Sequence, residues 1–175
     1  MSTHRFDAET YGRIVESGAL DDLRVELVDG WIVDMSPPSP PHSAPIVRLT
    51  HLLDGGESFL RVQLPLHVAD DSVPQPDIAL TGSEGDWDHH PTTAQLVVEV
   101  AVSSHRLDRG RKAELYAAAG VPEYWVVDVP GSAVEVHRDP RPAGGYGTVT
   151  VHRGGDELTP PVAGIAPFTV AHLLR

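Results

Sequence analysis

The clearest hydrophobic pattern in the chain is the apolar run at residues 95–102, whose only charged residue is Glu99. Its length and valine content are typical of a strand that is buried on both faces of a sheet. A second apolar run follows at 123–128. Between the two, residues 107–119 predict a helix that stops at Gly120, two residues before a proline. This region therefore predicts a strand, a helix and a second strand.

The N-terminal part predicts a hairpin after a first helix. Residues 7–17 have the pattern of a short helix that ends near Gly18. The runs at 24–28 and 31–35 then flank the dipeptide Asp29-Gly30, which favours a tight type I′ turn. These two runs are therefore expected to pair as antiparallel strands.

A proline-rich segment separates the hairpin from the rest of the chain. Residues 35–42 (Met-Ser-Pro-Pro-Ser-Pro-Pro-His) are expected to be extended or looped, because each proline disfavours helix before it. Residues 43–53 then predict a helix with its apolar positions on one side. The remaining expected elements are strands at 59–64, 66–69 and 74–80, an acidic surface loop at 82–91, a hairpin of 134–138 with 148–152, and a small helix or strand at 168–174.

Helices interleaved with more numerous strands predict an α/β (α+β) fold, with one mixed β-sheet flanked by helices. A length of 175 residues favours a single domain spanning 1–175. Apolar residues make up 41% of the chain and charged residues 22%, which is typical of a globular protein. We find neither a membrane-spanning run nor a signal peptide, so we expect no membrane association and a cytoplasmic location.

Composition restricts the chemistry that the chain can perform. It contains no cysteine, which excludes disulfides, zinc–thiolate sites and cysteine nucleophiles. The formal net charge is −12, an unfavourable starting point for binding the phosphates of DNA. Lys112 is the only lysine among the thirteen basic residues. A lysine is a compact point charge whose pKa can shift, so this position is a candidate for chemistry in which arginine would not serve.

Two acidic residues are candidates for a metal site. Glu99 lies inside the buried run, where a carboxylate is costly unless it is paired or bound to a metal. Strand alternation places it on the face of Val97 and Ala101. Asp77 begins a neighbouring strand. Two carboxylates on adjacent strands suit Mg²⁺, which takes one or two of them together with water and substrate phosphate.

Lys112 and Glu26 complete the candidate set. Helical spacing places Lys112 on the same stripe as Leu115 and Tyr116, the stripe that should pack on the sheet. The alternative is that Lys112 pairs with Asp108 one turn earlier and extends its ammonium to solvent. Glu26 alternates with apolar residues in the first strand, and from the pattern alone it is an exposed hairpin residue.

Six short motifs, together with their order along the chain, resemble the Uma2 family of "putative restriction endonucleases", which belongs to the PD-(D/E)XK nuclease superfamily. The resemblance covers about residues 23–128, with 129–175 as C-terminal strands. The motifs lie at 25–30 (Val-Glu-Leu-Val-Asp-Gly), 35–42, 76–78 (Pro-Asp-Ile), 96–101 (Leu-Val-Val-Glu-Val-Ala), 108–112 (Asp-Arg-Gly-Arg-Lys) and 116–125 (Tyr-Ala-Ala-Ala-Gly-Val-Pro-Glu-Tyr-Trp).

The resemblance implies a restriction-endonuclease-like core whose acids bind Mg²⁺ or Mn²⁺. Asp77 matches the acid of the PD motif, and Glu99 matches the acid of (D/E)XK. Glu26 matches the acid of the first family motif. The superfamily lysine would stand at Ala101, and similar sequences carry it on the following helix, where Lys112 stands.

Two hypotheses follow, from different classes. The first is a metal-dependent endonuclease acting on DNA, in which Asp77, Glu99 and the Val100 carbonyl bind the metal and Lys112 and Glu26 assist. The second is a nuclease fold without catalysis that serves as a homodimeric binding or regulatory module. The net charge favours the second hypothesis, and so does Val102, which stands where similar sequences carry an acid or serine. His42, the last residue of the proline-rich motif, is interpreted as a surface histidine, with a contact to substrate as the alternative.

Overall fold

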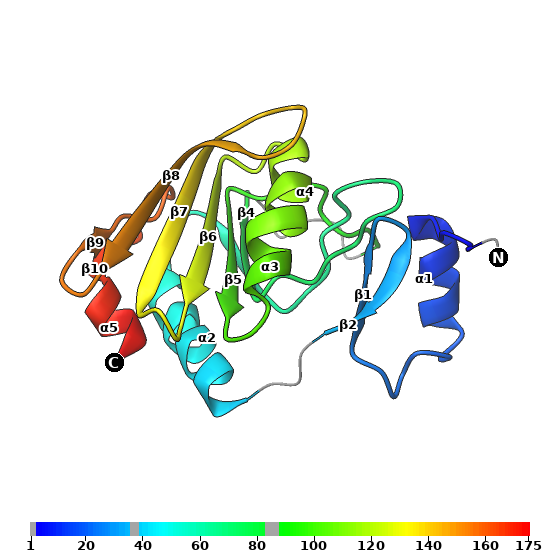
Figure 1. The fold of residues 1–175 in the computed structure, drawn as a ribbon, viewed down its shortest axis with the longest axis horizontal. Coiled ribbons are helices and arrows are strands. Elements are labelled where there is room, and N and C mark those ends of the chain that lie inside the picture. The colour runs from blue at the N-terminus through cyan, green and yellow to red at the C-terminus, as the bar shows by residue number, and fades with distance from the viewer. Residues whose placement is uncertain (1–2, 36–38, 83–87) are drawn as a thin grey trace.

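A six-stranded mixed sheet forms the centre of the protein, with strands in the order β3-β4-β5-β6-β7-β8 (Figure 1). The computed structural model describes residues 3–35, 39–82 and 88–175. The strands are β3 (Phe59–Val62), β4 (Ile78–Thr81), β5 (Leu96–Ala101), β6 (Glu123–Asp128), β7 (Ala133–Pro140) and β8 (Tyr146–Arg153). The pairing of β5 with β6 is parallel, and the other described pairings in this sheet are antiparallel.

A helical segment joins the two parallel strands, because such strands need a crossover connection. It consists of α3 (His105–Leu107), a π-helical turn η1 (Asp108–Lys112) and α4 (Ala113–Ala118). The helix predicted over 107–119 therefore starts two residues earlier and contains a π turn. It ends before Gly120, whose φ of +75° is of the kind that glycine favours.

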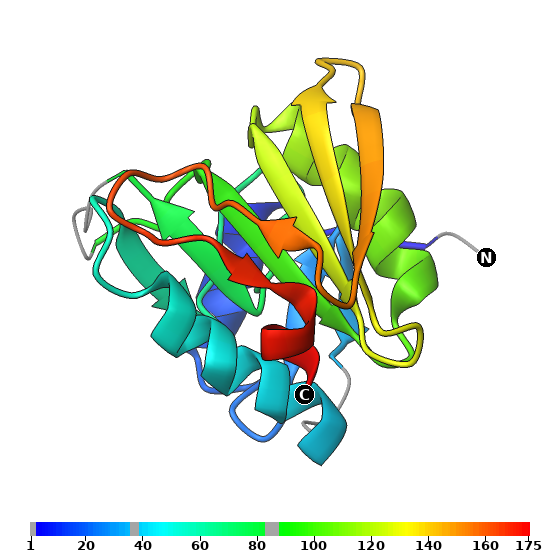
Figure 2. The ribbon, with the colours of Figure 1, turned by 90° about the vertical axis from the view of Figure 1, so that its left-hand side faces the viewer.

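The sheet carries helices on both faces. Helices α2 (Pro40–Leu53) and α5 (Val170–Leu174) cover one face, as Figure 2 shows, and bury Leu49 and Leu173 in the same core as Trp125. On the opposite face, Tyr116 of α4 packs in one cluster with Val97. The predicted α/β fold, one mixed sheet flanked by helices, is confirmed.

The N-terminal hairpin forms a separate small sheet beyond α4 (Figure 1). Strands β1 (Val25–Val28) and β2 (Trp31–Asp34) pair antiparallel, and α1 (Ala8–Glu16) lies beside them. The turn residues Asp29 and Gly30 have φ values of +53° and +74°, as a type I′ turn requires. Leu27 packs with Tyr11 of α1, so alternation turns Glu26 toward the rest of the molecule.

The proline-rich segment differs from the expectation at its end. Residues 40–42 are helical, because α2 begins at Pro40 with Ser39 as its N-cap. Proline is tolerated there, since the backbone N–H groups of the first turn have no partner within the helix. Residues 36–38 lie outside the described residues. Helix α2 therefore starts three residues before the predicted helix.

Other expectations hold in part. The predicted strand at 66–69 is absent from the described sheets; an isolated bridge between Ala69 and Ser72 marks a tight reversal there. A two-stranded sheet of β9 (Glu157–Leu158) and β10 (Phe168–Thr169) was not predicted near the C-terminus. The expected acidic loop at 82–91 includes residues 83–87, which lie outside the described part of the chain. Among the described helices, each is too short or too polar to cross a membrane.

Candidate active site

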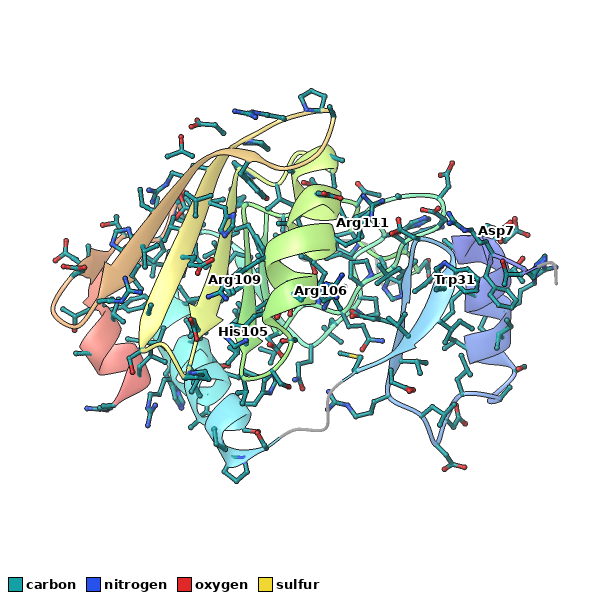
Figure 3. The ribbon with its side chains drawn as sticks, in the orientation of Figure 1. Asp7, Trp31, His105, Arg106, Arg109 and Arg111 are labelled. Carbon is teal, nitrogen blue, oxygen red and sulfur yellow. The ribbon has the colours of Figure 1, made fainter. Side chains whose placement is uncertain are left out.

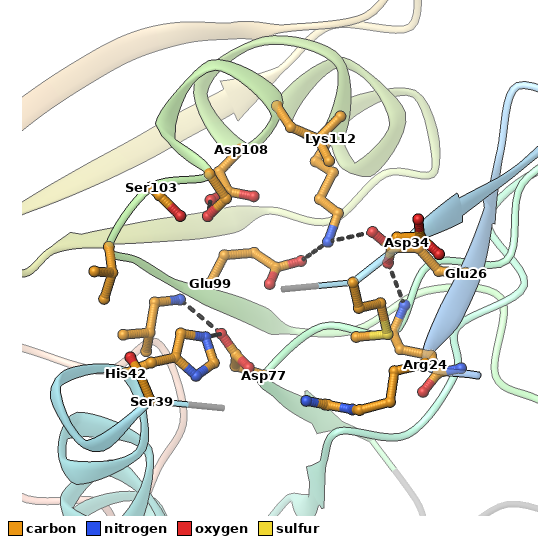
Figure 4. Close-up of a pocket in the computed structure, with 16 residues that line it drawn as sticks. Arg24, Glu26, Asp34, Ser39, His42, Asp77, Glu99, Ser103, Asp108 and Lys112 are labelled. Atoms are coloured by element: carbon orange, nitrogen blue, oxygen red, sulfur yellow. Dashed lines mark hydrogen bonds and ion pairs between the residues drawn. The ribbon is translucent and has the colours of Figure 1, made fainter. Parts of the chain in front are cut away.

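A cavity of about 280 Å³ opens between the N-terminal hairpin, the start of α2, the end of β5 and the α3–α4 segment (Figure 4). Segments that are far apart in the sequence therefore supply its walls. All five predicted site residues line it: Glu26, Asp77, Glu99, Val100 and Lys112. Val102, which the sequence marks as a departure from similar proteins, also lines this cavity.

The two predicted metal-binding acids lie next to each other across the sheet. Ile78 of β4 pairs with Val98 of β5, so the preceding residue, Asp77, lies opposite Glu99 on the same face. The Val100 N–H donates to Asp77 Oδ2 at 2.8 Å. Within a strand the N–H and C=O of one residue point to the same side. The Val100 carbonyl therefore points to the side of β5 on which Asp77 lies.

Lys112 points into the cavity from the π turn. Its Nζ lies 3.0 Å from Glu99 Oε1 and 2.9 Å from Glu26 Oε1 (Figure 4). The residue is only 5% exposed. The alternative interpretation, in which Lys112 pairs with Asp108 and extends to solvent, is therefore wrong. The helical stripe that predicted an inward lysine is observed.

Glu26 is buried, with 2% of its surface exposed, which overturns its interpretation as an exposed hairpin residue. Its Oε2 accepts a hydrogen bond from the backbone N–H of Gln75 at 3.0 Å, and its other oxygen contacts Lys112. The alternation of β1 was read correctly, but both faces of this strand are covered. One face packs on α1, and the other faces the cavity.

His42 is a second residue whose interpretation changes. Its Nε2 lies 3.2 Å from Asp77 Oδ2, and its side chain is 15% exposed, so it is not a surface histidine. The cause is the early start of α2, which places His42 in the first helical turn, where it lines the cavity. Gln63 Nε2 donates to the other oxygen, Asp77 Oδ1, at 3.1 Å. Asp77 therefore has partners on both oxygens.

Sequence reasoning missed two further polar groups at the site. Asp108 is 2% exposed, lines the cavity and accepts a hydrogen bond from Ser104 Oγ. Tyr116 OH donates to Glu99 Oε1 at 2.8 Å. The signal for both was available, because they share the helical stripe of Lys112. Only the folded chain shows that this stripe faces a polar cavity at one end.

Buried acids outnumber buried bases here, and this imbalance controls the ionisation of the site. Burial raises the pKa of Glu99 to about 8, an effect that Lys112 offsets and that Asp77 and Asp108 reinforce. Burial also raises the pKa of Asp108. Burial opposes the charge of Lys112, but Glu99, Glu26 and Asp108 outweigh it and raise the pKa of that lysine.

The pKa of Asp77 is shifted in the opposite direction from those of Glu99 and Asp108. Burial favours its protonated form, yet the hydrogen bond from His42, the N–H of Val100 and the amide of Gln63 together hold its pKa below the usual value. The same hydrogen bond raises the pKa of His42, although burial opposes this. Asp77 is therefore more firmly ionised than Glu99 or Asp108.

The donor set fits a hard divalent cation. Two carboxylates on adjacent strands and a backbone carbonyl are oxygen ligands, which Mg²⁺ prefers together with water. The excess of buried acid over Lys112 also favours a bound cation. Among the described residues, however, no three His, Asp or Glu side chains are already gathered as metal ligands. A bound ion would therefore take two side chains and complete its shell from the backbone and water.

The chain is similar to known proteins both in sequence and in fold. The family model Uma2, described as "Putative restriction endonuclease", matches residues 8–171. A crystal structure described as a "putative nuclease belonging to DUF820", from Anabaena variabilis, superimposes with a TM-score of 0.67 at 17% sequence identity. The match covers 86% of this chain and 89% of that one. A likeness at this identity shows a shared fold. Among curated proteins no match was found.

Proposed function

Because the chain belongs to the Uma2 family, we propose that it is a divalent-metal-dependent nuclease that hydrolyses phosphodiester bonds in DNA. One observation carries this proposal. Asp77 and Glu99 lie opposite each other on neighbouring strands, at the wall of a cavity into which Lys112 also projects. Acids and a lysine gathered in this way are the groups that phosphodiester hydrolysis needs.

Asp77, Glu99 and the Val100 carbonyl would hold Mg²⁺ or Mn²⁺. When bound, the ion supplies Lewis-acid stabilisation of the phosphate oxygens and lowers the pKa of water. Tyr116 and Lys112 both contact Oε1 of Glu99, and these two bonds fix the orientation of the carboxylate. His42 and Gln63 fix that of Asp77.

Lys112 would act on the reacting phosphate. Its ammonium is held at the cavity wall by two carboxylates, so its position is set before substrate arrives. A cation positioned in advance stabilises the charge that develops on the phosphate in the transition state. Glu26 holds Lys112 in place from the other side, which makes it a positioning residue in this proposal.

The test is cleavage of supercoiled plasmid DNA in Mg²⁺ or Mn²⁺, with EDTA as the blank. Asp77→Asn and Glu99→Gln each keep the side-chain shape and remove one charge, and we expect each to abolish cleavage. Asp70→Asn, in an exposed loop, is the matched control and should cleave like the wild type. Cleavage that survives both active-site changes would refute the proposal.

One observation favours the second hypothesis, a non-catalytic module. Lys112 is already engaged by two carboxylates, and both oxygens of Asp77 have partners, so these charged groups are paired without a metal. Titration calorimetry with Mn²⁺ separates the two. The nuclease proposal expects saturable binding that Asp77→Asn removes. Absence of binding would support the module.

We further propose that the chain forms a homodimer through strand β8. Strand β6, although apolar, lies inside the sheet, and Trp125 on it is fully buried, so it offers no interface. Strand β8 is instead an edge strand, and its Val149 and Val151 are 50% and 46% exposed. Apolar edge strands favour pairing with another strand. Light scattering should give twice the chain mass for the wild type, and Val151→Lys should give the monomer.

A further inference from the structure

Arg61 on β3 is a buried cation with no counter-charge among the residues that the structure describes. It is 5% exposed, and its Nε is enclosed without a hydrogen-bond partner. The contact from Nη2 to the Pro65 carbonyl is long, at 3.5 Å. Among the described residues no carboxylate lies within ion-pair distance of it. Burying an unpaired charge is costly, so the position of Arg61 calls for an explanation.

Two arginines of the α3–α4 segment are neutralised by acids. Figure 3 shows these residues, Arg109 and Arg111, along this segment. Arg109 contacts Asp128 and Glu135, and Arg111 contacts Asp29 and Glu114. These side chains cannot attract a phosphate without first giving up an acid. Arg61 carries no such competitor among the described residues.

Arg61 lies on the same face of the sheet as the candidate active site. Its partner across the sheet is Ala79, which belongs to the core cluster on the α4 side. Gln63, just past the end of β3, contacts Asp77. Ala79 is two residues from Asp77, and two residues of a strand span about 7 Å, so Arg61 lies about that far from Asp77 along the strand direction.

Two histidines accompany Arg61. His67 and Arg61 both lie close enough to His90 to lower the pKa of that histidine, an effect to which burial contributes most. The backbone N–H of His67 donates to the Pro91 carbonyl at 2.9 Å, which ties the two histidine-bearing loops together. His90 is exposed, so the cluster opens to solvent on its side. Three basic side chains therefore gather here within an acidic protein.

We propose that Arg61, with His67 and His90, forms a phosphate-binding site for the nucleic-acid strand next to the cleavage site. The inference rests on the proposed function. A guanidinium can donate two parallel N–H hydrogen bonds to one phosphate. Arg61 would therefore bind a phosphate more strongly than a side chain with a single donor. The site also gives a chain of net charge −12 a local means of holding a polyanion.

The test measures binding, without catalysis. A fluorescein-labelled single-stranded DNA oligonucleotide is titrated in EDTA, with fluorescence anisotropy as the readout. We expect Arg61→Gln to weaken binding about tenfold and to reduce the slope of log K against log salt by about one. Arg13→Gln, exposed on α1, makes the same charge change and should bind like the wild type. Arg61→Lys keeps the charge and should retain part of the affinity.

A second readout is thermal unfolding with inorganic phosphate. Phosphate should raise the Tm of the wild type and leave that of Arg61→Gln unchanged. Equal oligonucleotide binding by the wild type and Arg61→Gln would overturn the inference. A wild type that responds to inorganic phosphate but does not bind the oligonucleotide would also overturn it. Normal metal-dependent cleavage with unaltered binding in Arg61→Gln would refute only this inference. Loss of binding in Arg61→Gln without cleavage by the wild type would refute only the nuclease proposal.

Discussion

Replacing Lys112 with methionine should destabilise the protein strongly, because it leaves two buried carboxylates without their cation. Glu26 and Glu99 are 2% and 5% exposed, and each contacts Nζ of Lys112. Removing one partner of a buried ion pair costs roughly 3 to 5 kcal/mol. The free energy of unfolding of natural domains is about 5 to 15 kcal/mol, which is larger than this loss over most of that range. Most molecules of the variant should therefore still fold.

The magnitude can be measured by urea and thermal unfolding, followed by circular dichroism. For a chain of this size about 1 kcal/mol shifts the Tm by about 2 to 4 °C, so Lys112→Met should lower it by roughly 6 to 20 °C. The triple variant Glu26→Gln, Glu99→Gln, Lys112→Met removes all three charges together. It should recover most of the loss, because the buried charges no longer lack a partner.

The pH dependence of Lys112→Met gives a second check. The pKa of Glu99 is raised to about 8 in the folded wild type, chiefly by burial, and loss of the lysine should raise it further. An acid whose pKa is raised by folding stabilises the fold below its unfolded pKa, and this contribution is lost as pH rises through the folded value. The loss in free energy of unfolding that Lys112→Met causes should therefore shrink as pH falls from 8 to 5. A loss below about 1 kcal/mol that does not change with pH would refute this account.

Three other outcomes are expected. Mn²⁺ should raise the Tm of the wild type and not that of Asp77→Asn, since removal of an anionic ligand removes the ion; an equal rise in both would contradict the assignment. In NMR titrations Asp77→Asn should lower the pKa of His42, because the hydrogen bond to Asp77 raises that pKa. The contribution of His42 to folding stability is present below its unfolded pKa and disappears as pH rises through its folded pKa. Tyr116→Phe should cost about 1.5 to 3 kcal/mol in urea unfolding, the range for a hydrogen bond to a charged acceptor, and a neutral result would show that this contact to Glu99 is not needed.

Local patterns were sufficient for the strands of the central sheet and for the inward lysine. The valine-rich run around Glu99 is buried throughout, as its composition predicted. The stripe of Lys112 and Tyr116 faces the sheet, because helical periodicity fixes which residues share a side. The Asp29-Gly30 turn followed from the ability of these residues to adopt positive φ.

Burial of individual side chains could not be read from the same patterns. Glu26 has the alternation of an exposed residue, and its burial arises because the hairpin packs on Gln75 and Lys112, which are distant in sequence. His42 follows prolines that suggested a loop, and its contact with Asp77 depends on α2 starting at Pro40. Neither outcome has a local cause.

The amino-acid sequence by itself determined the strands of the central sheet, the fold class, the family resemblance and the residues that we propose for the chemistry. Each of these depends on composition, on periodicity or on short motifs, which act within a few residues of the chain. The tertiary structure decided that Lys112 contacts two acids and not one, and that Asp108 and His42 line the cavity. It also decided that Arg61 is buried with an unpartnered Nε and with no carboxylate partner in the described part of the chain. These outcomes depend on which surfaces meet when distant segments pack, and packing creates both the low dielectric and the charge imbalance that control the site.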